Sequence, residues 1–160
     1  MKKIAIVLFV VSMLASLLVV GTAYADKSGP NASGNGGGLE KWVTGGCKIF
    51  FGPPEEGAHL TFAGTIGITS NGDFRGNMVV IDRGSDLIWR CNSFTSVDIV
   101  GNVATFTGNF VNNLGDSLEV TLCITDNGEP GAGVDTLKGS NEYGPFGGAI
   151  AAGNFQVHSK

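Results

Sequence analysis

From Trp42 onward, the chain alternates between apolar and polar residues in short runs, which are separated by turns rich in glycine, asparagine and aspartate. No window keeps the i, i+3, i+4, i+7 apolar spacing of an amphipathic helix. Within each of four runs, the apolar residues are separated by an even number of positions and so share one face of a strand. They are Leu60, Phe62, Ile66 and Ile68; Phe74, Met78 and Val80; Ala104, Phe106 and Phe110; and Leu118, Val120, Leu122 and Ile124. Alternation with a period of two, bounded by turn residues, predicts an all-β fold.

The turn "TSNGD" sets the register of the first two runs. A three-residue loop, residues 70–72, with Gly72 in the left-handed conformation, pairs Ile68 with Phe74. A two-residue Asn-Gly loop would instead place Arg75 opposite Ile68. Because a slip of one residue moves every side chain to the other face, burial selects the three-residue loop. With a two-residue turn at "VGNV", the further predicted pairs are Phe62 with Val80, Val97 with Phe106, and Ile99 with Ala104.

The runs add up to about eight antiparallel strands joined by short loops, each strand with one apolar face. A meander of that size closes into an up-and-down barrel or folds over into a sandwich. Gly64, Gly76 and Gly108 fall on inward positions, where glycine permits the strand bends of a small barrel. We therefore predict an all-β, single antiparallel meander that forms a small β-barrel, with a β-sandwich as the alternative.

The N-terminus reads as a secretory signal peptide over residues 1–25. Two lysines precede an apolar stretch from Ile4 to Val20, and "AYA" supplies small residues where a signal peptidase cuts. The alternative is a membrane anchor, because the stretch approaches the ~20 residues that span a bilayer. Residues 26–39, rich in glycine, serine and asparagine, predict a flexible linker, and residues 40–160 predict the β-barrel domain. We expect a secreted protein with no membrane span once the signal peptide is removed.

The charge balance bears on partners. Without residues 1–25 the chain keeps eight basic and fourteen acidic residues, a net charge of −6. An acidic chain without a basic cluster argues against nucleic acid and anionic membrane surfaces as partners.

Three cysteines, Cys47, Cys91 and Cys123, allow one bridge and one spare thiol in an oxidising compartment. The alternative is three small buried hydrophobic residues. Strand parity puts Cys91 inward and Cys123 outward, which disfavours a bond between them. Pairings with Cys47 remain open.

The sequence shows no hydrolase elbow, zinc-protease motif, phosphate loop or dinucleotide fingerprint. His59 and His158 are far apart in sequence, and a solvent-facing or structural role competes with a shared site. Glu55 and Glu56 could imitate a glycosidase pair, but neighbouring residues of a strand point to opposite faces, and a surface loop suits them better. No catalytic residue is predicted.

Trp42, Trp89 and Tyr143 are large amphipathic aromatic residues. Exposed together on one side of a barrel, they would stack on sugar rings, which predicts an extracellular glycan or cell-surface partner. The competing interpretation places each in the core or at its rim.

The stretch "TDNGEPGAGVD" contains three carboxylates, Asp126, Glu129 and Asp135, among glycines and a proline. Calcium takes six to eight oxygen ligands, which flexible acidic turns supply, so these residues are the candidate calcium site. The spacing does not match the EF-hand loop. The alternative is turn chemistry, with Asp126 bonding its own backbone in an Asx turn.

Four segments, "VTGGCKIFFG", "GNVATFTGNF", "TDNGEPGAGVDT" and "GGAIAAGNFQVH", occur in the order found in a family of secreted β-domains. Over about Trp42 to His158 the chain resembles the post-COAP domain family. It departs from that pattern at Cys47, where glycine is usual, at Leu137, where phenylalanine is usual, at Phe155, where isoleucine is usual, and by the insertion in "AIAAGN". The resemblance implies an exported all-β domain and supplies no enzymatic activity, substrate or cofactor.

Together these observations predict a non-catalytic exported domain that acts in extracellular binding or cell-surface association, with calcium as the one candidate ion. The alternatives are a self-associating structural component of the extracellular matrix or envelope and, with less support, a secreted hydrolase. The oligomeric state is left open.

Overall fold

The described residues form ten antiparallel strands in one sheet. The structure is a computed structural model, and it describes residues 38–50 and 59–160. The strands are β1 (Leu39–Phe50), β2 (His59–Thr69), β3 (Phe74–Asp82), β4 (Leu87–Cys91), β5 (Phe94–Val100), β6 (Val103–Asn112), β7 (Ser117–Thr125), β8 (Thr136–Asn141), β9 (Gly144–Ala149) and β10 (Ala152–Ser159). Within this part of the chain, no helix is long and apolar enough to cross a membrane.

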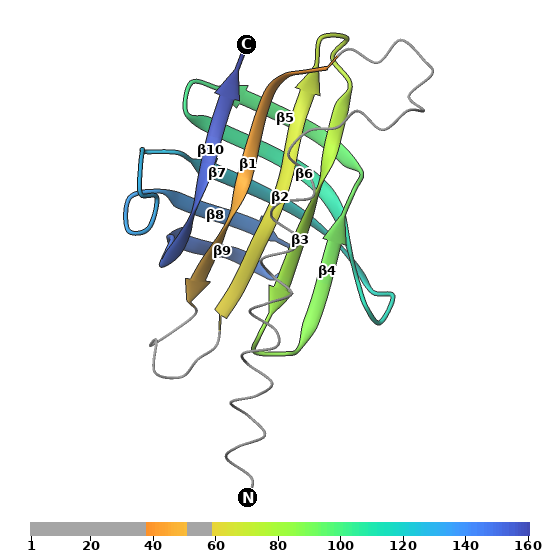
Figure 1. Ribbon diagram of the computed structural model, residues 1–160. Coiled ribbons are helices and arrows are strands. Elements are labelled where there is room, and N and C mark those ends of the chain that lie inside the picture. The colour runs from red at the N-terminus through yellow and green to blue at the C-terminus, as the bar shows by residue number, and fades with distance from the viewer. Residues whose placement is uncertain (1–37, 51–58) are drawn as a thin grey trace, which may run out of the picture. The chain divides into compact units, whose positions relative to one another are not determined.

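The order across the sheet is β10-β1-β2-β3-β4-β6-β7-β8-β9, and β5 pairs with β6 beside this path. Figure 1 shows the sheet curling over, so that the strands from β10 to β4 form one arm and those from β5 to β9 the other. The strands of the two arms cross steeply in that view. The sheet is thus a half-barrel, which confirms the predicted all-β, barrel-like meander, with two strands more than the expected eight.

The chain passes from one arm to the other at β4 and β5. Trp89 and Arg90 of β4 pair with the last residues of β6. β5 then pairs with the rest of β6, beginning at Gly108. A Cβ atom at Gly108 would lie 2.5 Å from the Cys91 sulfur. The absence of a side chain at Gly108 therefore lets the bend between β4 and β5 pack against β6.

Both predicted hairpin registers are confirmed. Ile68 pairs with Phe74, and the loop between them is closed by a hydrogen bond of 2.9 Å from the amide of Gly72 to the carbonyl of Thr69. Gly72 has a φ of +84°, the left-handed conformation that the three-residue loop requires. The other predicted pairs are also observed: Phe62 with Val80, Val97 with Phe106, and Ile99 with Ala104.

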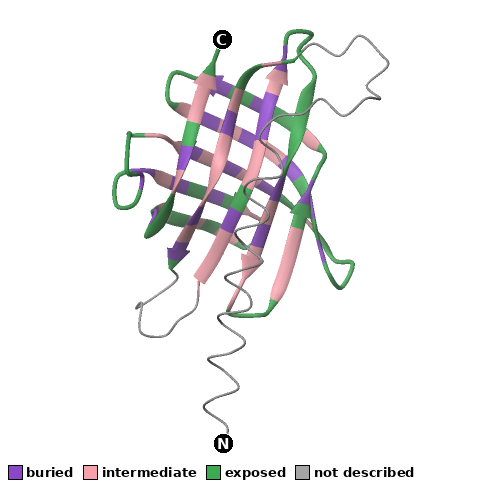
Figure 2. Cartoon of the chain, in the orientation of Figure 1, coloured by how far each residue is buried: buried purple, intermediate pink, exposed green. Residues whose placement is uncertain are grey.

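The core lies between the two arms, where buried and exposed residues alternate along most strands (Figure 2). Its largest fully buried aromatic residues are Phe62, Phe106, Phe110 and Phe155. Phe74 has the same parity as the buried Met78 but is 40% exposed, because it lies at the hairpin end, beyond the last buried residue on its face of β3.

All three cysteines are free thiols. Cys91 is buried on the inner face and Cys123 is partly exposed, as strand parity predicted. Burial, and then the negative charge of Asp135, raise the pKa of Cys47 to about 12. Cys47 is therefore a neutral core residue at neutral pH.

Candidate ligand-binding pocket

A pocket of about 760 Å³ opens between the two arms of the half-barrel. It lies among the first residues of β2, β4 and β7, the last residues of β3, β6 and β8, and the start of β9. Its apolar wall includes Leu60, Phe62, Val80, Trp89, Leu118 and Phe146. Four of these, Leu60, Trp89, Leu118 and Phe146, are only partly buried, although they pack against the core. The core is thus incompletely filled at this place.

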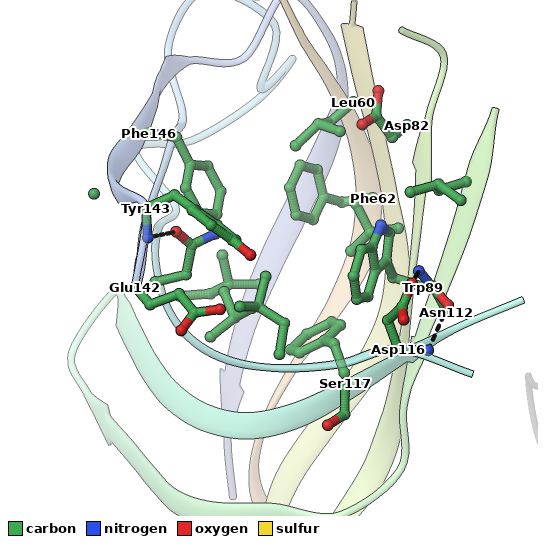
Figure 3. Close-up of a pocket in the computed structure, with 18 of the residues that line it drawn as sticks. Leu60, Phe62, Asp82, Trp89, Asn112, Asp116, Ser117, Glu142, Tyr143 and Phe146 are labelled. Carbon is green, nitrogen blue, oxygen red and sulfur yellow. Dashed lines mark hydrogen bonds between the residues drawn. The ribbon is translucent and has the colours of Figure 1, made fainter. Parts of the chain in front are cut away.

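Trp89 forms one wall of the pocket. It pairs with Val80 of β3 on one side and with Asn112 of β6 on the other, so it lies where β4 joins the two arms. Figure 3 shows Tyr143 and Phe146 on the opposite side of the pocket from Trp89. Aromatic side chains from β4 and from the β8–β9 region therefore face one space.

Phe146 reaches its position because glycine occupies the paired site on β8. Phe146 pairs with Gly139, and a Cβ atom at Gly139 would lie 2.2 Å from the phenylalanine ring. The ring therefore occupies the space that a side chain at position 139 would fill.

The β6–β7 turn fixes one polar part of the pocket. Buried Asn112 accepts hydrogen bonds of 2.9 Å from the amides of Leu114 and Asp116. Its side-chain nitrogen donates to the Asp116 carboxylate at 3.0 Å. Asn112 therefore holds the turn and orients Asp116, as the dashed line in Figure 3 shows.

Two other turns complete the mouth of the pocket, defined here by the carboxylates of Asp82, Asp116 and Glu142. Asp82 accepts hydrogen bonds from the Gly84 amide at 2.8 Å and the Ser85 hydroxyl at 2.6 Å, in the turn after β3. Glu142 lies in the β8–β9 turn beside Tyr143, which is 84% exposed. A hydrogen bond with Glu142, and then the charge of that carboxylate, raise the pKa of Tyr143.

The acidic loop (residues 126–135) lies at the opposite end of β7 from the pocket and docks on β10. β10 is the last strand of the sheet, and two of its backbone amides donate to loop carboxylates. The Phe155 amide donates to Asp135 at 3.3 Å, and the Val157 amide donates to Asp126 at 3.0 Å. The acidic loop thus replaces the missing neighbouring strand at this edge of the sheet.

The second oxygens of Asp126 and Asp135 also accept hydrogen bonds, and one oxygen of Glu129 accepts two. Asp126 accepts from the Gly128 amide at 3.0 Å, which is the Asx turn considered from the sequence. Asp135, which is fully buried, accepts from the Asn127 amide at 2.8 Å. Glu129 accepts from the side-chain amides of Asn154 and Gln156 at 2.8 and 2.7 Å.

The three loop carboxylates therefore bind different partners along β10 and within the loop. Among the residues that the structure describes, no group of three or more histidine, cysteine or acidic side chains gathers to hold a metal ion. Calcium in this loop stays a prediction, and the ion would compete with the hydrogen bonds just described.

The structure separates the three predicted stacking residues. Trp89 and Tyr143 line the pocket, whereas Trp42 does not. Trp42 stacks on His158 across β1 and β10, with ring centroids 4.9 Å apart and an angle of 21° between the planes. A single platform of all three aromatic residues is therefore not formed.

The two histidines lie at opposite ends of β1. His158 pairs with Trp42, and His59 pairs with Phe50, eight residues further along the strand, about 26 Å away. They do not form one site. Glu55 and Glu56, like the predicted signal peptide and most of the predicted linker, lie outside the described residues.

Sequence reasoning missed most of the pocket. Asp82, Asp116 and Glu142 were not singled out, because each lies in a different turn and no local motif joins them. Inward parity predicted Leu60, Phe62, Val80 and Leu118 as core residues. The position of the pocket depends on how the two arms cross. No local sequence pattern shows that crossing.

No family model, no curated protein and no solved structure matches the chain. The resemblance to the post-COAP domain family accordingly stays a prediction, and the function is argued from the pocket itself.

Proposed function

We propose that the protein is an exported, non-catalytic binding module whose pocket takes a small molecule with an apolar body. The observation that carries this proposal is the 760 Å³ pocket between the arms, with its partly exposed aliphatic and aromatic wall. Ligand sites in proteins are commonly clefts of about 300–1,000 Å³ with mostly apolar linings and a few polar groups. The pocket has this size and this composition.

Binding is favoured over catalysis by the state of the polar groups. Two of the three mouth carboxylates, Asp82 and Asp116, are held by turn backbone, serine or asparagine side chains. They stabilise the turns from which the pocket is built. An apolar wall supplies the free energy of burying a ligand, about 25 cal/mol per Å² of apolar surface removed from water.

Export is the second part of the proposal, and it rests on the N-terminal sequence alone. The "AYA" stretch before Asp26 predicts the cleavage point. The mass of the protein recovered from the culture medium or the cell envelope tests it. We expect a chain that begins at Asp26; a chain that keeps residues 1–25 would favour the membrane anchor.

A self-associating structural component has less support. β9 is the other end of the sheet, but it is only six residues long and contains Pro145 and three glycines. Short edges with proline resist pairing with another chain. The most exposed large hydrophobic side chains, Leu114, Val100 and Tyr143, lie on separate elements.

A thermal melt with 1-octanol tests the pocket. A ligand that binds only the folded state raises the melting temperature, by an amount that grows with ligand concentration. Leu118→Trp places a large side chain in the pocket and should abolish the rise. Leu114→Trp is the matched control, because Leu114 is 74% exposed and does not line the pocket. A rise that survives in Leu118→Trp, or no rise in the unmodified protein, would refute the assignment.

A further inference from the structure

We infer that the ligand of this pocket is a cationic amphiphile, an apolar body with an amine or quaternary ammonium head. The inference rests on the proposed function and adds the chemical class of the ligand. It is carried by the charges around the mouth, the aromatic residues of the pocket wall and the hydrogen bonds that orient the carboxylates.

The charges at the mouth all have one sign. Asp82 ends β3, Asp116 lies between β6 and β7, and Glu142 lies between β8 and β9, so the carboxylates come from three separate turns. Figure 3 shows them at different sides of the pocket. No lysine, arginine or histidine is among the described residues that line it. An anionic head would therefore meet like charges without a basic partner.

The aromatic residues of the pocket add a second attraction for a cation. Trp89 and Tyr143 line the pocket on opposite sides. A cationic group over the face of tryptophan or tyrosine is attracted by the ring quadrupole. We expect an alkyl chain to pack against Leu60, Phe62 and Leu118, which line the same pocket. The head and the body of such a ligand thus each meet a matching surface.

Hydrogen bonding to the protein does not remove this preference. An ionised carboxylate offers about four lone-pair positions, so Asp82 keeps its charge and spare acceptor capacity after bonding Gly84 and Ser85. Asp116 donates no proton and accepts one side-chain hydrogen bond from Asn112. Glu142 bonds the Tyr143 hydroxyl and is itself exposed, so its negative charge stays beside the opening. The three carboxylates position negative charge around the opening.

The test uses three probes with the same alkyl chain: octyltrimethylammonium, 1-octanol and octanoate. The chain has two tryptophans, so Trp42→Phe leaves Trp89 as the single indole reporter and keeps an aromatic ring against His158. Titration of Trp89 fluorescence gives the affinity for each probe. Each exposed ion pair changes affinity by about two- to fivefold, so the ammonium probe should bind about tenfold more tightly than octanol. Octanoate should bind more weakly than octanol, and added salt should reduce the differences.

Replacing the mouth carboxylates by amides separates the contribution of charge to binding from the contribution of pocket shape. In the background of Trp42→Phe, Glu142→Gln should reduce the advantage of the ammonium probe, and adding Asp82→Asn and Asp116→Asn should remove it while octanol still binds. Glu142→Gln alone keeps the test valid if the triple variant does not fold. Equal binding of ammonium and octanol by the starting protein would overturn the cationic head and leave the pocket's function intact. Failure of all three probes would overturn both.

Discussion

The chain carries two sets of three carboxylates at opposite ends of β7, and they have different environments. In the acidic loop, Asp126, Glu129 and Asp135 accept hydrogen bonds from the loop itself and from β10. At the pocket mouth, the three carboxylates come from separate turns around an apolar space. The first set closes an edge of the sheet, whereas the second borders a space large enough for a ligand. The acids that are clustered in the sequence therefore have a structural role, whereas the acids at the proposed binding site come from separate parts of the sequence.

The sharpest test of the structural role is Asp135→Ala. Asp135 is fully buried, and the substitution removes the acceptor of the Asn127 and Phe155 amides. A buried unsatisfied donor costs about 1–3 kcal/mol, and the Phe155 bond is buried while the Asn127 bond is part-buried, so we expect a loss of about 3 kcal/mol in the free energy of unfolding in urea. Asp135→Asn keeps one acceptor oxygen and should lose less. A loss below about 0.5 kcal/mol, the range of neutral surface changes, would contradict the structural role.

The same chemical change at two glycines compares the two regions directly. Gly131 in the acidic loop has a φ of +79°, and a Cβ atom there would lie 2.2 Å from the Asn154 side-chain oxygen. Gly131→Ala should therefore destabilise the protein by about 2 kcal/mol, through left-handed strain and the clash.

Gly139→Ala makes the matching change at the pocket, where the new methyl group meets the Phe146 ring. The ring can rotate away, so the cost in stability should be smaller, about 1 kcal/mol. The displaced ring should enter the pocket and weaken octanol binding. Equal losses of stability in the two variants, with octanol binding unchanged in Gly139→Ala, would show that the pocket end is packed as rigidly as the loop.

The pH dependence of stability tests the burial of Cys47, whose pKa is raised by burial and then by the charge of Asp135. Because the pKa of Cys47 is raised to about 12 in the folded protein, its thiol stays neutral while the unfolded thiol ionises from about pH 8.5 upward. The unfolded state then binds fewer protons, so stability falls as pH rises between those values, by about 1.4 kcal/mol per pH unit for this thiol. Cys47→Ala should flatten the slope by that amount, as measured by urea unfolding at a series of pH values. Identical slopes in the variant and the unmodified protein would remove the claim that Cys47 is buried and neutral.

Calcium should have the smallest effect. All three carboxylates of the acidic loop already accept hydrogen bonds, so a melt in millimolar calcium should match one in chelator. A clear rise in melting temperature would show that the loop exchanges these bonds for metal ligands, and would establish the calcium site that the sequence suggested.

The sequence predicted what depends on neighbouring residues. Parity and turn chemistry gave the β-class, the register of Ile68 with Phe74, and the opposite faces of Cys91 and Cys123. It also offered an Asx turn at Asp126 as one interpretation of the acidic loop, and that turn is present. These features depend on local period and local hydrogen bonding, which a single strand or turn contains.

What escaped prediction depends on residues distant in sequence. The docking of Asp126 and Asp135 on β10 joins positions 31 and 20 residues apart. The separation of Trp42 from Trp89 and Tyr143 depends on which strand faces are inner and where the arms cross. The alternation of apolar residues identifies the inner face of each strand. It does not show where the inner faces of the two arms leave a pocket between them.

The most direct test of the comparison is an NMR titration of the isotope-labelled protein with 1-octanol. The two tryptophan indoles give two separate signals, one from the pocket and one from the stack with His158. We predict saturable shifts for the Trp89 indole and the Phe146 amide, and unchanged signals for the Trp42 indole and for the Phe155 and Val157 amides that bind the acidic loop. Shifts at Phe155 and Val157 without a shift at Trp89, or no shifts at saturating octanol, would contradict the account.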